Sequence, residues 1–377
     1  MSATIEAPAT NGHTDARPKT FIVDCDVHHS VGKGDALYPY MPRHFVEYMK
    51  DFGNMLPKLG YTNMPGGGAR IDLRDGETKE SVTAQPTICI EKHLDVYDID
   101  YAILTGGPYT AAVHTNPDFA SAYCSAFNDY TKDHWLTADP RFRGSIHICP
   151  TDTQLAAKEI DRLGPDPGFV QVMLPAGARM PYGNRHYHPI YEACERHGLP
   201  VSVHFGAEGA GIASPPTAAG YPTYYLEMRM ARPQIAQAHV TSLVVEGVFE
   251  KFPNLQFTFV EMDTFWLPGL MWHMDLDWRA LRDYTPWVKQ LPSEYIRKHI
   301  RLGTQPMPDL PGGKKDLETY LRWMHAEDTL VFASDYPHWD WDEPGHTLQG
   351  IDKDLYNRIM GKNAAEVLGL SQCRNIS

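Results

Sequence analysis

The sequence predicts an α/β protein built as a (β/α)8 TIM barrel with a long insertion after its first strand. Three observations indicate this fold: eight short apolar runs, helical segments between them, and ionisable residues at the ends of the first, fifth and eighth runs. Strands that alternate with helices form parallel sheets, and eight such units can close into a barrel. The alternative is an open doubly wound sheet, but no GxGxxG motif follows the first strand.

The eight predicted strands have the β-branched, apolar character of strands buried on both faces. They cover residues 20–28, 101–106, 143–149, 169–174, 200–205, 256–262, 300–304 and 329–334. The clearest helical segments between and after them are 116–138, 151–163, 188–197, 232–252, 316–325 and 352–368. Gly369 follows the last segment directly and is predicted to be its C-cap.

A single domain over residues 20–377 is predicted, because one barrel commonly takes about 250 residues or more. Residues 1–19 are rich in Ala, Thr and Pro and are predicted to be a disordered N-terminal tail. Residues 29–90 separate the first strand from its helix and carry several prolines and a run of three glycines at 66–68. A connection of this length is typical of a lid over a barrel's active site, although a flexible surface loop has the same composition.

The net charge of −13 argues against a nucleic-acid surface and gives no support for docking on anionic membranes. No stretch of about 20 apolar residues predicts a membrane span. The six cysteines are scattered without a CxxC pair, and no secretory signal is recognised, which predicts reduced thiols in a cytoplasmic protein. Motifs for NAD, flavin, phosphate-loop or pyridoxal cofactors are not found, so the expected partner is a small-molecule substrate.

Metal-competent side chains end three of the predicted strands. Asp26 and His28 are two residues apart and therefore project from the same face of the first strand. His204 ends the fifth strand and Asp335 the eighth. Each could have an ordinary structural role, as a buried histidine or a capping aspartate. Because barrel geometry directs all of them to one place, they predict a site for a divalent metal.

These motifs resemble the amidohydrolase superfamily, in particular the amidohydrolase 2 group that includes aminocarboxymuconate-semialdehyde decarboxylase. The resemblance rests on the first-strand Asp-x-His, the fifth-strand His, the Ser-Asp-Tyr-Pro at 334–337 and the segment GVFEKFPNLQF at 247–257. It extends from about residue 20 to residue 370 and is specific for the group, not for one reaction. It implies that Asp26, His28 and His204 are metal ligands, and that Asp335 both touches the metal and handles the proton of the activated water. A homo-oligomer is also expected from the resemblance.

The sixth strand departs from the decarboxylase pattern. Where that enzyme has a proton-moving histidine, this sequence has Glu261. Glu261 is predicted to be a general acid or base, or a metal ligand that bridges to a second ion. Its alternative is a carboxylate that orients a histidine ligand. With the other ligands it gives an oxygen-rich set, which suits Zn first and also Mn or Fe, as one ion or two.

Weaker candidates follow other strands. His338 lies three residues after Asp335, close enough for a hydrogen bond or proton relay, and is the third predicted catalytic residue beside Asp335 and Glu261. The predicted substrate-binding residues are His114, Arg179, Arg185 and Trp266. The arginines could pair with a substrate carboxylate, or could equally be solvated surface charges. Trp266 could line an aromatic pocket or simply pack.

The leading functional hypothesis is a metal-dependent hydrolase that acts on a small organic acid, amide or lactone through metal-activated water. The first alternative is a non-oxidative decarboxylase of an aromatic or muconate-type acid. The second is a non-haem di-iron oxygenase on the same barrel, since a carboxylate-rich site can hold two irons and a fold alone does not decide the reaction.

Overall fold

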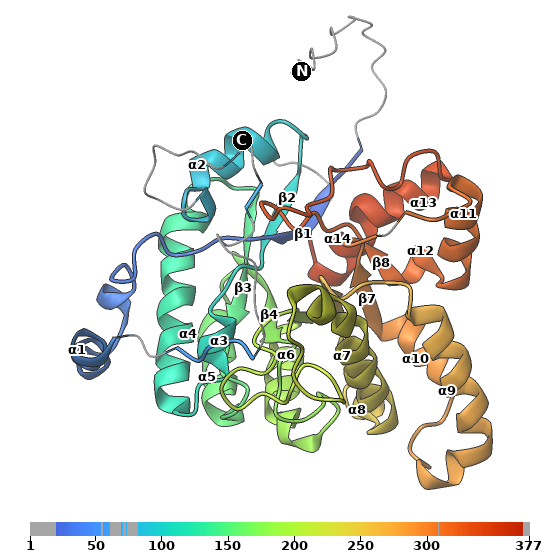
Figure 1. Cartoon of the computed structure of the whole chain (residues 1–377), viewed down its shortest axis with the longest axis horizontal. Helices are drawn as coiled ribbons and strands as arrows, with labels where there is room; N and C mark the ends of the chain where they lie inside the picture. The colour runs from blue at the N-terminus through green and yellow to red at the C-terminus, as the bar shows by residue number, and fades with distance from the viewer. Residues whose placement is uncertain are drawn as a thin grey trace, which may run out of the picture.

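The computed structural model of the protein describes residues 20–53, 56–60, 69–70, 73, 82–307 and 309–371. Within these residues, eight strands form one sheet in the order β1 to β8, with every neighbouring pair parallel. The sheet is nearly closed into a barrel with the helices around it (Figure 1), so the predicted fold is confirmed. The predicted tail at 1–19 and the glycine run of the insertion lie outside the described residues.

Every strand overlaps its predicted run. The strands are β1 Val23–Val27, β2 Tyr101–Leu104, β3 Phe142–His147, β4 Phe169–Pro175, β5 Val201–His204, β6 Phe257–Val260, β7 Ile300–Gly303 and β8 Leu330–Val331. Strand β8 is the shortest, because side chains and not backbone carbonyls accept the hydrogen bonds of the residues that follow it. Ala333 N donates to Thr304 Oγ1 at 3.1 Å, and Ser334 N donates to Asp24 Oδ1 at 2.9 Å. Strand β8 therefore meets β1 through side chains as well as through backbone.

The longer helices largely follow the prediction. They are α1 Arg43–Phe52, α4 Pro117–Thr131, α5 Thr153–Leu163, α6 His188–His197, α7 Tyr225–Val245, α9 Leu267–Leu281, α10 Pro292–His299 and α11 Lys314–Trp323. Shorter ones are α2 Pro86–Cys89, α3 Tyr109–Ala112, α8 Val248–Lys251, α12 Ala326–Thr329, α13 Lys353–Asn357 and α14 Asn363–Leu368. Single turns of other helix types complete the chain: η1 Tyr38–Tyr40, η4 Val82–Ala84, η5 Ile90–Leu94, η6 Lys132–Leu136, η7 Arg185–Tyr187, η8 Arg282–Tyr284 and η9 Arg358–Lys362.

Three helical predictions need correction. Helix α7 begins at Tyr225, seven residues before the predicted start, because Pro233 lies inside the helix and not in its first turn. Helices α9 and α10 were not predicted. The predicted helix at 352–368 is divided by η9, where Gly361 packs so closely on the start of β1 that a Cβ would lie 2.3 Å from Phe21 O. Gly369 does end α14, with φ of 66°.

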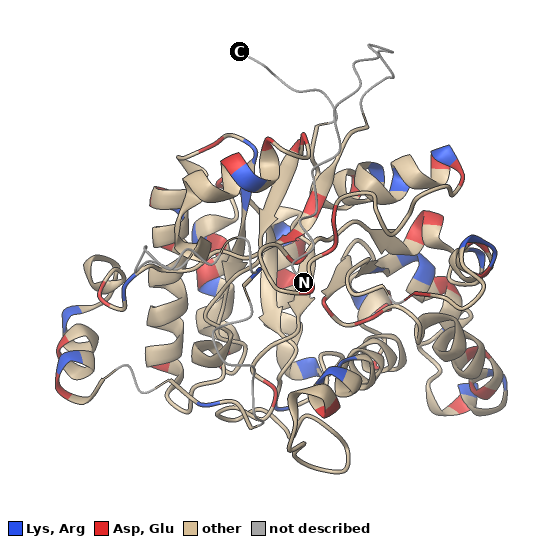
Figure 2. Ribbon diagram, turned by 45° about the horizontal axis from the view of Figure 1, so that its top comes forward, with Lys and Arg blue, Asp and Glu red and all other residues tan. Residues whose placement is uncertain are grey.

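Apolar side chains of the strands and the surrounding helices form the core, including Val203 of β5, Phe259 of β6 and Leu302 of β7. Burial of such side chains stabilises the fold by about 1.5–3 kcal/mol each. The outer helices carry charged residues of both signs (Figure 2). In the described part of the chain, none of the helices combines the length and the apolar character needed to cross a bilayer.

Candidate metal centre

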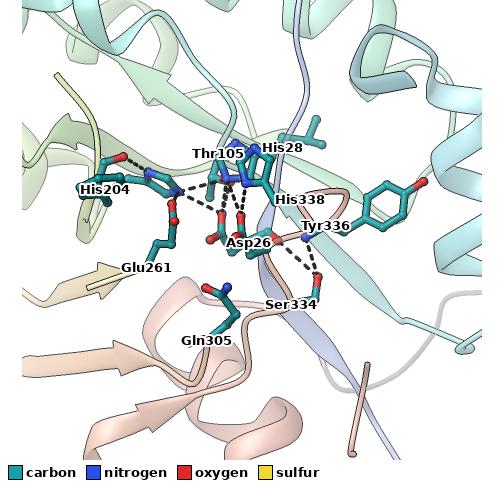
Figure 3. A network of polar contacts seen from close by, with 12 residues as sticks. Asp26, His28, Thr105, His204, Glu261, Gln305, Ser334, Tyr336 and His338 are labelled. Atoms are coloured by element: carbon teal, nitrogen blue, oxygen red, sulfur yellow. Dashed lines mark hydrogen bonds and ion pairs between the residues drawn. The ribbon is translucent and has the colours of Figure 1, made fainter. Parts of the chain in front are cut away.

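Side chains from the carboxyl ends of four strands converge at one end of the barrel (Figure 3). Asp26 belongs to β1 and His28 follows it, His204 ends β5, Glu261 follows β6, and Asp335 comes shortly after β8. The carboxyl ends of parallel barrel strands meet at the same mouth, which is why residues this far apart in sequence come together. The four sequence-predicted ligands and Glu261 therefore share one place.

The nitrogen and oxygen atoms of this cluster face one another. His28 Nε2 and His204 Nε2 are 3.2 Å apart. Asp26 Oδ1 lies 3.4 Å from the former and 3.3 Å from the latter, and Asp335 Oδ1 lies 3.0 Å from His28 Nε2. Imidazole nitrogens and carboxylate oxygens that face a common point are the ligands that divalent transition metals prefer.

His204 is oriented for ligation by its neighbours. Its Nδ1 lies 2.5 Å from Phe205 O and donates to that carbonyl, which leaves the lone pair of Nε2 directed at the cluster. The ring of Tyr109 stacks on the imidazole, with centroids 4.9 Å apart and planes 8° from parallel. Thr105 supports the opposite side by donating to Asp26 Oδ1 at 2.5 Å. Tyr109 and Thr105 were not identified from the sequence.

The cluster also contains acceptors that lack a donor. Among the described residues, Asp26 Oδ2 and Asp335 Oδ2 are buried without a hydrogen-bond partner. Unpaired buried carboxylate oxygens are costly unless a cation satisfies them. Two overlapping groups have ligand atoms within 4.8 Å of one another: Asp26, His28 and His204, and His28, Glu261, Asp335 and His338. The residues present therefore fit a divalent cation.

The charge of the site favours a cation as well. Burial lowers the pKa of His204, but the carboxylates of Asp26, Glu261 and Asp335 together raise it by more, to about 9. Burial likewise raises the pKa of Asp26, and His204 and His28 lower it to about 2. Asp26 thus stays a carboxylate, and its negative charge attracts a positive partner. In the absence of a metal, a proton on His204 supplies that charge.

Two of the cluster residues have strained backbones. Glu261 and Asp335 have φ of 58° and 63°, in the left-handed region that non-glycine residues seldom occupy. Such conformations cost roughly 1–3 kcal/mol each and persist where the surroundings enforce them, often at functional sites. Both strained residues contribute a carboxylate oxygen to the same candidate ligand group.

Glu261 is held by a residue that the sequence did not point to. Arg232 of α7 donates from Nη1 to Glu261 Oε1 at 2.5 Å, and both side chains are buried. The second carboxylate oxygen, Oε2, lies 3.8 Å from His204 Nε2. Burial and the nearby Asp335 raise the pKa of Glu261 to about 7, although Arg232 opposes this shift. An arginine on a helical segment looks like a surface charge, and no local pattern reveals its partner 29 residues away.

His338 pairs with Asp335, as its spacing predicted. Its Nδ1 lies 2.5 Å from Asp335 Oδ1, and 26% of its side chain is exposed. Burial lowers the pKa of His338, but the carboxylates of Asp335, Glu261 and Asp26 together raise it by more, to about 10. Burial raises the pKa of Asp335 to about 6 despite its contact with His338. The pair therefore links the buried cluster to the surface through an imidazole that carries a proton.

The predicted substrate-binding residues lie outside the two ligand groups. His114 Nδ1 accepts from Asn116 N at 3.0 Å in the turn before α4. Trp266 is 8% exposed, and its Nε1 donates to the carbonyls of Met262 and Asp263. Arg179 and Arg185 are exposed. Their role toward a substrate stays a prediction.

Comparison with known proteins identifies the family of this chain. The model of a family described as amidohydrolase matches residues 23–370. A curated relative, 2-amino-3-carboxymuconate-6-semialdehyde decarboxylase from Dictyostelium discoideum, is 23% identical over 340 residues, which is 85% of this chain and 89% of the relative.

Solved structures with the same fold include an amidohydrolase from Mycobacterium avium subsp. paratuberculosis K-10, at 18% identity and a TM-score of 0.69, covering 94% of this chain and 100% of that one. A dihydroxybenzoic acid decarboxylase from Polaromonas sp. JS666, with bound manganese and the inhibitor 2-nitroresorcinol, has 17% identity and a TM-score of 0.63, covering 95% and 99%. The family match spans nearly the whole barrel, and this chain belongs to the amidohydrolase family.

Proposed function

We propose that this protein is a metal-dependent decarboxylase of a small aromatic or unsaturated carboxylic acid. The observation that carries the proposal is the buried set of Asp26, His28, His204 and Asp335, in a chain whose curated relative over 340 residues is a decarboxylase. This choice puts the first alternative from the sequence ahead of the hydrolase. The metal is a divalent ion, with manganese favoured by the Polaromonas structure and zinc by the ligand types.

The divalent ion would supply positive charge that holds the substrate carboxylate and stabilises the negative charge left on carbon as CO2 departs. The chain itself must then deliver a proton to that carbon. We assign this step to His338, whose Nδ1 is engaged by Asp335 and whose Nε2 is the nitrogen left to donate. Its partial exposure allows the ring to regain a proton from solvent.

Glu261 has a different part in this scheme. Because Arg232 holds its Oε1, Glu261 is less free to move protons than a histidine at the same place. We propose that it fixes the β6 side of the site, with Oε2 beside His204, and excludes water there. We therefore assign the delivery of the proton, which was predicted for Glu261 from the sequence, to His338.

Two other functions have a specific observation in their favour. Hydrolysis would use the unpartnered Asp335 Oδ2 as the acceptor for a water proton. A di-iron oxygenase would use the second ligand group, His28, Glu261, Asp335 and His338, for another ion. The decarboxylase relatives favour neither of these, and we place both behind decarboxylation.

The test is CO2 release from a panel of acids by the manganese-loaded protein. The panel contains 2,6-dihydroxybenzoate, 5-carboxyvanillate and 2-amino-3-carboxymuconate semialdehyde, with lactones and amides assayed in parallel. A matched pair of variants is His338→Gln and His197→Gln, since His197 also pairs with an aspartate, Asp161, at 2.9 Å and is 20% exposed.

Decarboxylation predicts CO2 release that falls roughly 100-fold or more in His338→Gln and is unchanged in His197→Gln. Lactone or amide hydrolysis without CO2 release would replace the proposal with the hydrolase. Full activity of His338→Gln would remove His338 from the proton step and return that step to Glu261.

A further inference from the structure

The barrel closes between β1 and β8 at an interrupted seam. Cys25 N donates to Phe332 O at 2.9 Å, and His28 N donates to Tyr336 O at 2.7 Å. Among the described residues, the bridge between β1 and the segment after β8 is the isolated pair of Val27 and Tyr336, and not a continuous ladder. The seam is therefore irregular at the level of Asp26 and Ser334, directly beside the metal cluster.

The carboxylate of Asp24 fills this interruption. In the described structure its Oδ1 accepts from Asp26 N at 3.2 Å and Ser334 N at 2.9 Å, and its Oδ2 accepts from Ser334 Oγ at 2.6 Å and His93 Nε2 at 2.7 Å. Asp24 is fully buried. These four bonds use the lone pairs of both oxygens, so Asp24 has no capacity left to bind a cation.

The histidine of this network comes from the turn that directly follows the insertion. His93 lies in η5, is fully buried, and stacks on Tyr336 with centroids 4.3 Å apart and planes 15° from parallel. Tyr336 follows Asp335 directly. His93 thus fixes Asp24 on one side and packs on the chain next to a predicted ligand on the other.

The backbone groups that Asp24 binds belong to the metal site itself. One is the N–H of the ligand Asp26, and the other is the N–H of Ser334, which precedes the ligand Asp335. We propose that Asp24 is a positioning residue that sets the separation of the β1 and β8 ligands, and that metal affinity depends on it although it cannot touch the ion. This inference rests on the proposed metal site.

The expected loss of metal affinity can be judged from residues that orient metal ligands in other proteins. Groups that orient metal ligands typically account for 10–100-fold in metal affinity. In Asp24→Asn, the amide oxygen can still accept from the two backbone N–H groups. The amide nitrogen takes the place of Oδ2, and it cannot accept a hydrogen bond from Ser334 Oγ or from His93 Nε2. Phe at position 93 keeps the stacking on Tyr336 and loses the hydrogen bond. Both changes should weaken the seam without removing a ligand.

The experiment measures the manganese affinity of the full chain by competition with a chromophoric chelator, together with the melting temperature of the metal-free protein. The variants are Asp24→Asn and His93→Phe. The control is Glu159→Gln, because Glu159 is also a buried carboxylate with several donors, Asn128, Ser125 and Arg162, but joins α4 to α5. All three variants should melt at lower temperature than the wild type.

The inference predicts a 10–100-fold loss of manganese affinity in Asp24→Asn and His93→Phe, and an unchanged affinity in Glu159→Gln. Wild-type affinity in a folded Asp24→Asn would overturn it, as would an equal loss in the control. If Asp24→Asn does not fold, Ser334→Ala removes only one donor and should still weaken manganese binding several-fold; an unchanged affinity there also overturns the inference. Failure of the wild type to bind manganese would instead reject the proposed metal site.

Discussion

The two halves of the metal cluster are built differently. On the β1–β8 side, Asp26 and Asp335 stand on chain segments that are tied together through backbone bonds and the Asp24 carboxylate. On the β5–β6 side, His204 and Glu261 are oriented by side chains from elsewhere, since Tyr109 stacks on the former and Arg232 of α7 binds the latter. The first half is fixed by the seam between β1 and β8, and the second depends on side chains of the helices α3 and α7.

Because of this difference, we expect substitutions in the two halves to affect folding and metal binding differently. The ligands of the seam share bonds that also close the barrel, so a change there affects folding and metal binding together. The β5–β6 half is supported by partners outside the sheet, and substitutions of those partners can separate the two properties. The following predictions test this distinction.

The largest effect is expected from removing the β5 ligand. His204→Ala deletes one of the three candidate ligands in the group of Asp26, His28 and His204. It should lower manganese affinity by more than the roughly 100-fold expected for a residue that only orients a ligand. Chelator competition measures the affinity, and His239→Ala provides a buried histidine of α7 as the control. An unchanged affinity in His204→Ala would mean that the β5 half does not bind the ion.

The next effect concerns the partner from α7. Arg232→Met leaves the buried Glu261 carboxylate without its cation, and should lower the free energy of unfolding by about 3–5 kcal/mol. Denaturant unfolding measures the change. The double variant Arg232→Met/Glu261→Leu should recover most of the loss, because no unpaired charge remains. A loss in the double variant as large as in the single one would show that Arg232 acts through packing alone.

The third prediction concerns His239, which lies outside both halves of the cluster and should change the free energy of unfolding by about 2 kcal/mol as the pH falls. Burial lowers the pKa of His239 to about 4, against 6.5 for the free side chain. The unfolded chain therefore binds the proton first, and stability is lost as the pH falls from 6.5 toward 4. Between pH 6.5 and pH 5 His239 alone should contribute a loss of roughly 2 kcal/mol. Burial also lowers the pKa of His147 to about 3 and of His299 to about 4, and these two groups add to the total loss. Unfolding curves of metal-free protein measure the total, and His239→Gln should reduce it by roughly 2 kcal/mol; an equally steep dependence in that variant would contradict the assignment.

The smallest effect tests the stacking on His204. The Tyr109 hydroxyl donates to Thr105 O, so Tyr109→Phe should cost about 1 kcal/mol of stability and leave the ring in place. Tyr109→Leu removes the stacking as well and should reduce manganese affinity by less than 10-fold. Equal manganese affinities of the two variants would show that the stacked ring does not support His204.

The strands, and the candidate ligands that the fold brings together, could be predicted from the sequence because both depend on local patterns. Apolar β-branched runs mark buried strands, and a polar residue such as His204 at the end of a run stands out. The spacing to Asp335 also identified His338. The residues that orient the candidate ligands were not identified, because their contacts are not local in the sequence. Arg232, Tyr109 and Asp24 act through contacts between distant segments. The partners of Asp24, for example, are His93 and Ser334, which are 69 and 310 residues away in the sequence.

The helix errors have a similar origin. The predicted helix began at Arg232, but α7 begins at Tyr225 and continues through Pro233 for a total of 21 residues. As a result the sequence placed Arg232 at a helix end instead of one turn beyond Met228, on the buried face. Tertiary contact overrode the local signal at that point.

Metal content of the chain tests the central claim most directly. The protein would be purified without chelator, loaded with manganese, zinc or iron in turn, and analysed for bound metal per chain beside Asp335→Asn. The account predicts about one ion per chain in the wild type and a large loss in the variant. Absence of bound metal under every loading condition, or equal metal in the two proteins, would contradict it, while two irons per chain would favour the oxygenase.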